Sequence, residues 1–224
     1  MLSLGFIAQA GRDDLGCELD PAGDPQRPLL VIDTDVAATA LEVDRAVANL
    51  RAAGAITVAV TRGSEPLASV ARAADIAIAQ GGTQSGAREA VWVGDPLAAA
   101  GELQARVEAS PVASLTLSWL LRGSAQLPVP DALVQESAAF SSLLAGGEFR
   151  AWLAARGAPR PPDGPERVEV SRAGDVLSIV LSRVKRRNAV DARMRDALRE
   201  ALTVAELDPP HRAANSRCPR SRWV

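Results

Sequence analysis

The sequence predicts an α/β fold, because short apolar runs alternate with amphipathic helices in its first third. Three runs have the composition of buried strands, namely Leu29–Ile32, Ile56–Val60 and Asp75–Ala79. Apolar residues recur at helical spacing over 37–53, between the first two runs, and a shorter helix ending at Ala74 separates the last two. Helical crossovers of this kind connect parallel strands, so we expect a parallel sheet covered by helices.

Beyond a short strand at Val91–Val93, the sequence up to residue 157 predicts helices only. They are expected at Leu97–Glu108, Pro111–Leu121, Pro130–Leu144 and Glu148–Arg156. Another helix is expected at the N-terminus, over Met1–Ala10. Residues 1–157 are therefore predicted to form one α/β unit with a helical C-terminal cluster, and 158–167 to form a proline-rich linker.

The remaining sequence predicts a smaller second unit. Val168–Val170 and Val176–Val180 alternate apolar and polar residues around Ala173–Asp175, as a β-hairpin does. A basic turn follows, and Ala192–Leu207 has the spacing of an amphipathic helix. We expect a hairpin and helix fragment over 168–208 and an irregular basic tail over 209–224.

The composition excludes several classes of function. With 25 basic and 27 acidic side chains the net charge is -2, so no global basic field exists to bind nucleic acid or a membrane surface. Tyrosine is absent and aromatics reach only 3%, which disfavours base-stacking platforms. Two cysteines are too few for a disulfide scaffold. No apolar stretch is long enough to cross a membrane and no signal peptide is recognised, so a cytoplasmic location is expected.

The most informative stretch is Val168–Leu202, in which a hairpin, Leu-Ser-Arg, a basic cluster, Asn-Ala-Val and a helix with Met194 follow in order. It resembles the opening of domains in the enoyl-CoA hydratase/isomerase (crotonase) family, over residues 168–207. Val184 departs from the family pattern, where proline is usual, and Ser182 replaces the common asparagine. The resemblance implies a crotonase-like parallel sheet with helices, followed by a C-terminal hairpin and helix fragment.

In that family the loop at Arg-Asn-Ala lies beside bound coenzyme A, where a cation can meet the phosphates. The resemblance therefore implies that coenzyme A, as part of an acyl-CoA substrate, contacts Lys185, Arg186, Arg187, Asn188 and Ala189. Arg187 is the best single candidate by position. The alternative is a solvated basic loop, since short basic runs are common.

The family's chemistry stabilises a thioester enolate with two oxyanion loops and one or two carboxylates. Neither loop is found after the helix that ends at Leu207, where the sequence becomes rich in arginine. The resemblance thus implies a chain that is truncated or frameshifted near residue 211 and weakly active or inactive. His211 and Cys218 lack partners in the sequence for a catalytic or metal-binding role.

A weaker resemblance to the same family covers 29–156. The turn Thr61–Glu65 corresponds to the family's active-site turn, and Glu65 is its only carboxylate. Glu65 is therefore the candidate general acid or base, against the alternative of a first-turn helix acid favoured by the dipole. The glycines of 81–86 do not fit a dinucleotide fingerprint and are interpreted as a loop.

Asp33 and Asp35 support a rival function, because an apolar strand running into Asp-x-Asp is typical of haloacid-dehalogenase-like phosphatases. In that chemistry the first carboxylate attacks a phosphate, the second is the acid or base, and Mg²⁺ joins them. Thr61 could supply the required hydroxyl, but no lysine precedes Lys185. The alternative is that both are strand-end acids, one of them capping the next helix.

The sequence therefore predicts an acyl-CoA-handling protein of fatty acid metabolism, whose family members act as lyases or isomerases. Neither a metal nor a separate cofactor is expected. Besides the phosphatase, a non-catalytic acyl-CoA-binding or oligomerisation module stays open. Helices within 111–149 are similar to those through which the family's subunits trimerise, so a homo-oligomer is considered.

Overall fold

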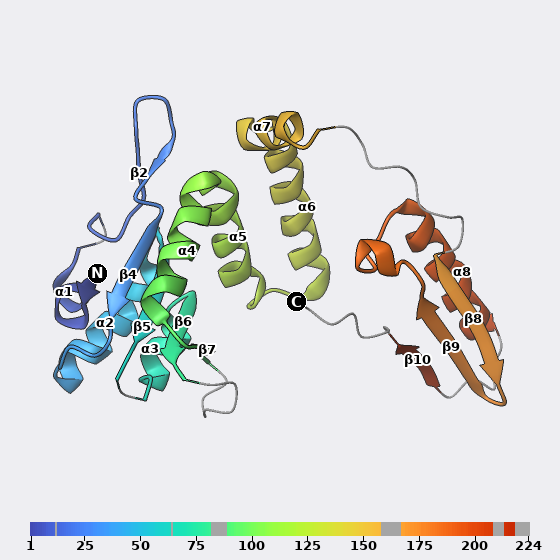
Figure 1. Ribbon diagram of the computed structural model, residues 1–224, viewed down its shortest axis with the longest axis horizontal. Coiled ribbons are helices and arrows are strands. Elements are labelled where there is room, and N and C mark those ends of the chain that lie inside the picture. Colours follow the sequence, from blue (N-terminus) through green and yellow to red (C-terminus); the bar gives the residue numbers. More distant parts are fainter. Residues whose placement is uncertain (12, 64, 82–88, 158–166, 208–212, 218–224) are drawn as a thin grey trace. The chain divides into compact units, whose positions relative to one another are not determined.

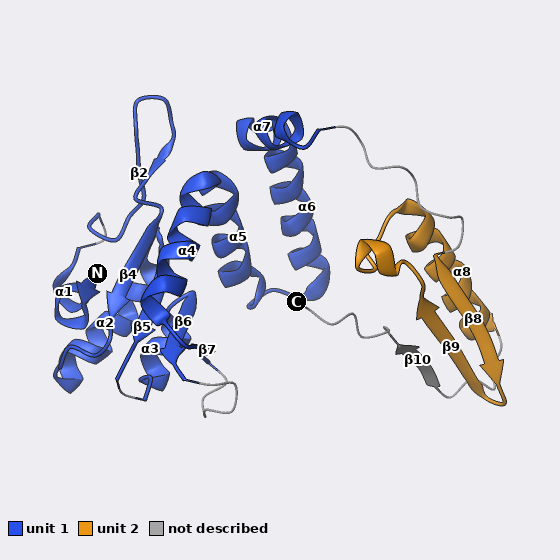
Figure 2. Ribbon diagram, in the orientation of Figure 1, with its two compact units in different colours: residues 1–157 blue, residues 158–224 orange. Residues whose placement is uncertain are grey.

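The structure is a computed structural model that describes the chain except residues 12, 64, 82–88, 158–166, 208–212 and 218–224, with only the backbone described for 213–217. It divides into two compact units, unit 1 (Met1–Gly157) and unit 2 (Ala158–Val224), which Figure 2 shows in different colours. Each unit has its own sheet and its own hydrophobic core.

A five-stranded parallel sheet in the order β1-β4-β5-β6-β7 forms the centre of unit 1 (Figure 1). Its strands are β1 (Leu2–Ser3), β4 (Leu29–Asp33), β5 (Ile56–Thr61), β6 (Ile76–Gln80) and β7 (Val91–Val93). The α/β class and the four strands from β4 onward are as predicted. Strand β1 was not predicted, since it contributes only two residues ahead of the expected N-terminal helix. A small antiparallel pair, β2 (Glu18–Leu19) and β3 (Pro25–Gln26), precedes β4.

Seven helices accompany this sheet in the described part of unit 1. They are α1 (Leu4–Gln9), α2 (Ala40–Ala52), α3 (Ala68–Ala73), α4 (Pro96–Ala109), α5 (Pro111–Ser124), α6 (Val129–Ala145) and α7 (Gly147–Ala155). Three of them begin at side-chain caps. Ser3 accepts the N–H of Phe6 on α1, Thr39 and Glu42 form a reciprocal capping box on α2, and Asp95 accepts two backbone N–H bonds at the start of α4. The predicted helical cluster after residue 96 is confirmed.

The sheet of unit 1 is covered on both faces. All six residues of β5 are buried, as expected for a central strand of a parallel sheet. On one face, Ile32 and Ala59 pack with α1, α2 and α3 in one core cluster. On the other face, Val58 and Val60 pack with residues of α4 and α5 in a second cluster. Alternate residues of β4 and β5 therefore face opposite helical layers, and the carboxyl ends of both strands lie between these layers.

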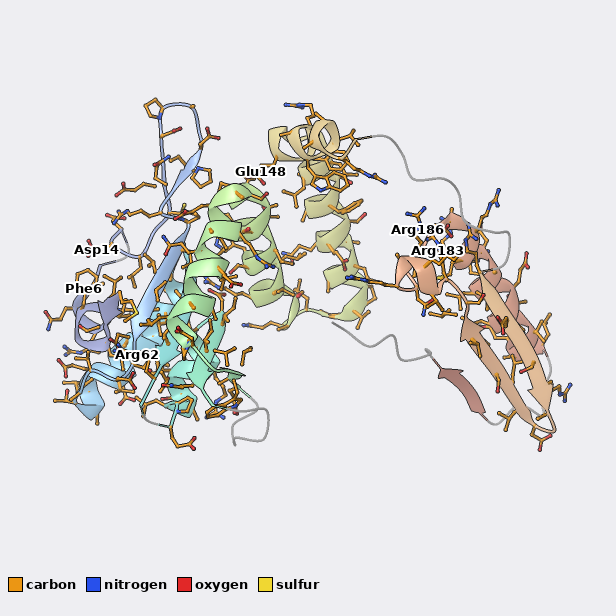
Figure 3. The ribbon with its side chains drawn as sticks, viewed as in Figure 1. Phe6, Asp14, Arg62, Glu148, Arg183 and Arg186 are labelled. Atoms are coloured by element: carbon orange, nitrogen blue, oxygen red, sulfur yellow. The ribbon has the colours of Figure 1, made fainter. Side chains whose placement is uncertain are left out.

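Helices α6 and α7 contain no buried residue. Their large apolar side chains that are at least half exposed are Val129, Leu133, Val134, Phe140, Trp152 and Leu153. Glu148 of α7 ties this pair to α5, because its carboxylate accepts N–H bonds from Val112 (2.7 Å) and Ala113 (2.9 Å) at the start of that helix (Figure 3). The pair therefore carries a wide exposed apolar surface.

Unit 2 contains a hairpin, β8 (Val168–Ala173) and β9 (Val176–Leu181), then the short 3₁₀ helix η1 (Val184–Arg186) and helix α8 (Ala192–Leu207). A third strand, β10 (Ala213–Arg217), pairs parallel with β9. The prediction of an irregular tail over 209–224 is therefore wrong for these five residues. Helix α8 connects β9 to β10 as a crossover, and β10 is defined by its backbone pairing with β9. Its sequence does not alternate apolar and polar residues, which is the pattern that predicts a strand.

Candidate functional site

The predicted coenzyme A loop lies between β9 and α8 in unit 2, and its backbone forms a tight, hydrogen-bonded turn. Arg187 and Asn188 both have positive φ, 52° and 56°. Asparagine adopts this conformation readily, whereas arginine does so at a cost. The turn is closed by N–H bonds from Arg187 to the carbonyl of Val184 (2.9 Å) and from Asn188 to that of Arg183 (3.0 Å).

Three charged residues outside the predicted coenzyme A contacts hold this turn in place. Arg183 donates to the carbonyl of Ala189 (2.5 Å) and pairs with the carboxylate of Asp191 (3.1 Å). Asp191 also pairs with Arg167 (3.1 Å), a residue that is only 6% exposed. The Asp191 carboxylate caps α8 by accepting the N–H of Met194 (2.9 Å). Asp191 thus connects the hairpin, the turn and the helix.

This network also sets the charge of Asp191. The hydrogen bond from the Met194 N–H is the main cause that lowers the pKa of its carboxyl, partial burial opposes it, and Arg167 and Arg183 lower it further. The carboxylate is therefore ionised at neutral pH and neutralises part of the positive charge at the base of the turn.

The candidate ligand-binding side chains on the turn differ in exposure. Lys185, Arg187 and Ala189 are exposed, whereas Arg186 and Asn188 are half-buried. Figure 3 shows Arg186 near Arg183 at this end of unit 2. Lys185 forms no ion pair with any residue that the structure describes. An incoming phosphate would therefore meet Lys185 without displacing an internal carboxylate.

The acids of the rival hypothesis lie at the carboxyl ends of β4 and β5 in unit 1. The structure brings Asp33 and Asp35 together, but the cation that pairs with both is Arg62. Figure 3 labels Arg62 in unit 1. Its guanidinium lies 2.6 Å from Asp33 and 3.2 Å from Asp35, and its backbone N–H donates to Asp35 (2.8 Å). Asp33 in turn accepts the N–H of Asp35 (3.0 Å). This closed ring of contacts fixes the turn after β5.

Thr61, the proposed hydroxyl of the phosphatase site, is 3% exposed and its hydroxyl lies 2.6 Å from that of Thr34. Its side chain is therefore engaged by the neighbouring strand end. Among the residues described, no three Asp, Glu, His or Cys side chains are grouped as metal ligands. Glu65 lies exposed just beyond this turn. Apart from Gly81, the glycine-rich segment 81–86 lies outside the described residues.

A third polar cluster, which sequence reasoning missed, lies where β5 and β6 begin. Asp75 accepts bonds from the Thr57 N–H (2.8 Å), the Thr57 hydroxyl (2.9 Å) and the Ser118 hydroxyl (2.9 Å). Arg122 of α5 forms a bidentate pair with the same carboxylate, with its Nε 2.6 Å away. Arg122 also donates to the backbone carbonyls of Ala53 and Ala55.

Burial raises the pKa of Asp75, but hydrogen bonds from Arg122, Thr57 and Ser118 outweigh it, so the pKa lies below its ordinary value. The cluster joins α5 to the sheet. No local sequence signal indicates it, because Asp75 and Arg122 are 47 residues apart.

Comparison with protein-family models, curated protein sequences and solved structures finds no match to this chain. Among the described helices, none combines the length and apolarity that a membrane span requires.

Proposed function

We propose that this chain is an acyl-CoA-handling protein of the enoyl-CoA hydratase/isomerase type, in which the turn 183–189 of unit 2 contacts the coenzyme A portion. The observation that supports the proposal is the turn itself. Its backbone is closed by internal hydrogen bonds and clamped by Arg183 and Asp191. Such a pre-organised turn presents cationic side chains with little further loss of conformational entropy on binding.

The turn contributes positively charged side chains to the proposed site. Coenzyme A carries phosphate groups, and an ammonium or guanidinium group binds them through charge-assisted hydrogen bonds. Lys185 and Arg187 are the exposed cations, with Arg186 half-buried beside them. Asn188 and Ala189 complete the loop that follows β9.

Hydratase activity is expected to be weak or absent. Enolate stabilisation needs backbone N–H groups that are free to donate to an oxyanion. Neither oxyanion loop of the family is found in the sequence, and the turn cannot replace them, because its N–H groups already donate to backbone carbonyls. The donors are Arg187, Asn188 and Ala189, at 2.9–3.0 Å from the carbonyls of Val184, Arg183 and Arg186. Glu65, the general acid or base suggested by the family resemblance, is an exposed loop residue of unit 1. The turn therefore supports binding of the thioester more than its chemistry.

Titration of the full chain with coenzyme A by isothermal calorimetry tests this proposal. We expect Lys185→Glu to weaken binding about tenfold or more, since a hydrogen bond to a charged group contributes ~1.5–3 kcal/mol. Arg199→Glu is the matched control, because it reverses one exposed charge of α8 away from the turn. Binding is also expected to weaken as salt rises.

Absence of coenzyme A binding, or equal losses in Lys185→Glu and Arg199→Glu, would overturn the assignment. Crotonyl-CoA is the second ligand to test, with loss of its enoyl absorbance as the readout. Binding without hydration is the expected result. Rapid hydration would overturn the expectation of weak activity.

A non-catalytic assembly module is the second candidate. The exposed apolar surface of α6 and α7 favours it, because patches of this kind in globular proteins mark interaction surfaces. Sedimentation velocity of the full chain distinguishes the two candidates. A self-associating chain that binds neither coenzyme A nor crotonyl-CoA would favour assembly over acyl-CoA handling.

A further inference from the structure

Unit 1 contains an open pocket of about 570 Å³ that none of the functions considered above uses. It lies between the C-terminal turns of α2 and α3 and the facing sides of α4 and α5, next to the first residues of β5 and β6. We call it the α4–α5 pocket. Its volume is within the range typical of sites for small organic ligands, roughly 300–1,000 Å³.

The walls of this pocket are mainly apolar. Its aliphatic lining side chains include Ile76, Leu103, Val107, Leu117 and Leu121. Leu117 and Leu121 are 55% and 61% exposed, so the surface that they present is accessible to a ligand. Burial of that surface by an alkyl chain would be favourable by the hydrophobic effect.

The charged residues around the pocket favour a negatively charged ligand. Three arginines (Arg51, Arg72 and Arg122) and one acid (Asp75) line it, which gives the lining a formal charge of +2 although the whole chain carries -2. Asp75 is neutralised by its bidentate pair with Arg122, so its carboxylate does not repel an anion. The charge available to a ligand therefore comes from the other two arginines.

Those two arginines are placed on the surface side of the pocket. Arg51 is exposed in the last turn of α2 and forms no ion pair with a residue that the structure describes. Arg72, in the last turn of α3, pairs with Glu89 at 3.2 Å, but its side chain is 60% exposed. A solvated pair of this kind is weak and can exchange partners at small cost.

We infer that the α4–α5 pocket binds an unbranched alkyl carboxylate, with the alkyl chain against the leucines of α5 and the carboxylate near Arg51 and Arg72. A cationic rim over an apolar lining matches an amphipathic anion in both charge and polarity. The pocket lies wholly within unit 1 and shares no residue with the turn 183–189, so this inference does not depend on the coenzyme A proposal.

The first test is calorimetric titration of the full chain with octanoate, decanoate and dodecanoate. Affinity is expected to rise about fourfold per methylene while the added carbons are buried, since one CH₂ contributes ~0.8 kcal/mol. Decanol, which has the same chain without the charge, is expected to bind several-fold more weakly than decanoate. No binding of decanoate, or an affinity independent of chain length, would overturn the inference.

Matched variants test the position of the ligand. Leu121→Ala is expected to weaken decanoate binding about fivefold by removing buried apolar contacts. Leu133→Ala on α6, where the leucine is 58% exposed and outside the pocket, is expected to leave decanoate binding unchanged.

The arginines are tested in the same way. Arg51→Glu is expected to weaken decanoate binding about fivefold, while Arg45→Glu on the same helix does not. Equal effects within either pair would overturn this assignment, even if decanoate binds elsewhere.

Discussion

Units 1 and 2 each place a β-sheet against helices, but they bury their sheets to different extents. In unit 1 both faces are covered, and β5 is buried along its whole length. In unit 2 the hairpin packs on α8 through a small cluster around Leu177, Ile179 and Ala201, while β8 is exposed from Glu169 onward. The same kinds of element thus form a thick layered core in one unit and a thin one in the other.

Charged groups differ between the units in a parallel way. In unit 1 they hold elements together, as Arg62 does for Asp33 and Asp35 and as Arg122 does for Asp75. In unit 2 Arg183 and Asp191 clamp a turn, which leaves Lys185 exposed at the surface. We therefore expect substitutions of Arg62 and Arg122 in unit 1 to change stability first, and substitution of Lys185 on the turn of unit 2 to change ligand binding first.

The largest expected contrast comes from the same substitution in a helix of each unit. Leu50 of α2 is fully buried, and Leu50→Ala is expected to lower the free energy of unfolding by about 2–5 kcal/mol, through lost burial and the cavity left behind. Leu202 of α8 is 48% exposed, and Leu202→Ala is expected to change the free energy of unfolding by less than about 0.5 kcal/mol. Urea unfolding followed by circular dichroism measures both, and similar losses would contradict the difference in core thickness.

A smaller loss of stability is expected when the Asp75 cluster is disrupted. Arg122→Met keeps an apolar stem but leaves Asp75 without its cation, and is expected to lower the free energy of unfolding by about 2–3 kcal/mol. Arg106→Met on the neighbouring helix α4 is the matched control, because Arg106 is exposed and forms none of these contacts. A loss in the Arg106 variant as large as in the Arg122 variant would show that the cluster adds nothing specific.

The sequence predicts much of this architecture because local patterns determine it. The apolar runs locate β4, β5 and β6 to within one residue, and helical spacing with proline and acidic starts locates α4 to α7. The basic turn at Arg183–Arg187 is likewise readable, since it separates a strand from a helix. These features depend on residues that are close together in the chain.

The features that sequence reasoning missed depend on distant partners. Strand β10 is defined by its pairing with β9, and the Asp75 cluster by a helix 47 residues away. Arg62 was not singled out because only the fold shows that its guanidinium lies between Asp33 and Asp35. Similarly, the α4–α5 pocket collects residues from six separate elements.

The smallest expected effect is a pH dependence of the free energy of unfolding that separates Arg122→Met from Arg106→Met further. The pKa of Asp75 lies below its ordinary value of 3.8 in the folded chain, so the unfolded chain binds its proton more tightly. The stability that comes from ionised Asp75 is therefore fully present above about pH 3.8, and it is lost as the pH falls through the lower folded pKa.

Urea unfolding at a series of pH values between about 6 and 2 measures this loss. Arg122→Met removes the cation that stabilises the carboxylate, so its stability should fall less steeply with acid than that of the natural chain, whereas Arg106→Met should keep the natural slope. Glu42 and Asp191, whose carboxyls also have a lowered pKa, keep their partners in all three proteins, because neither Arg122 nor Arg106 contacts them. The difference in slope between the two variants therefore isolates Asp75, and equal slopes would place the acid sensitivity outside this cluster.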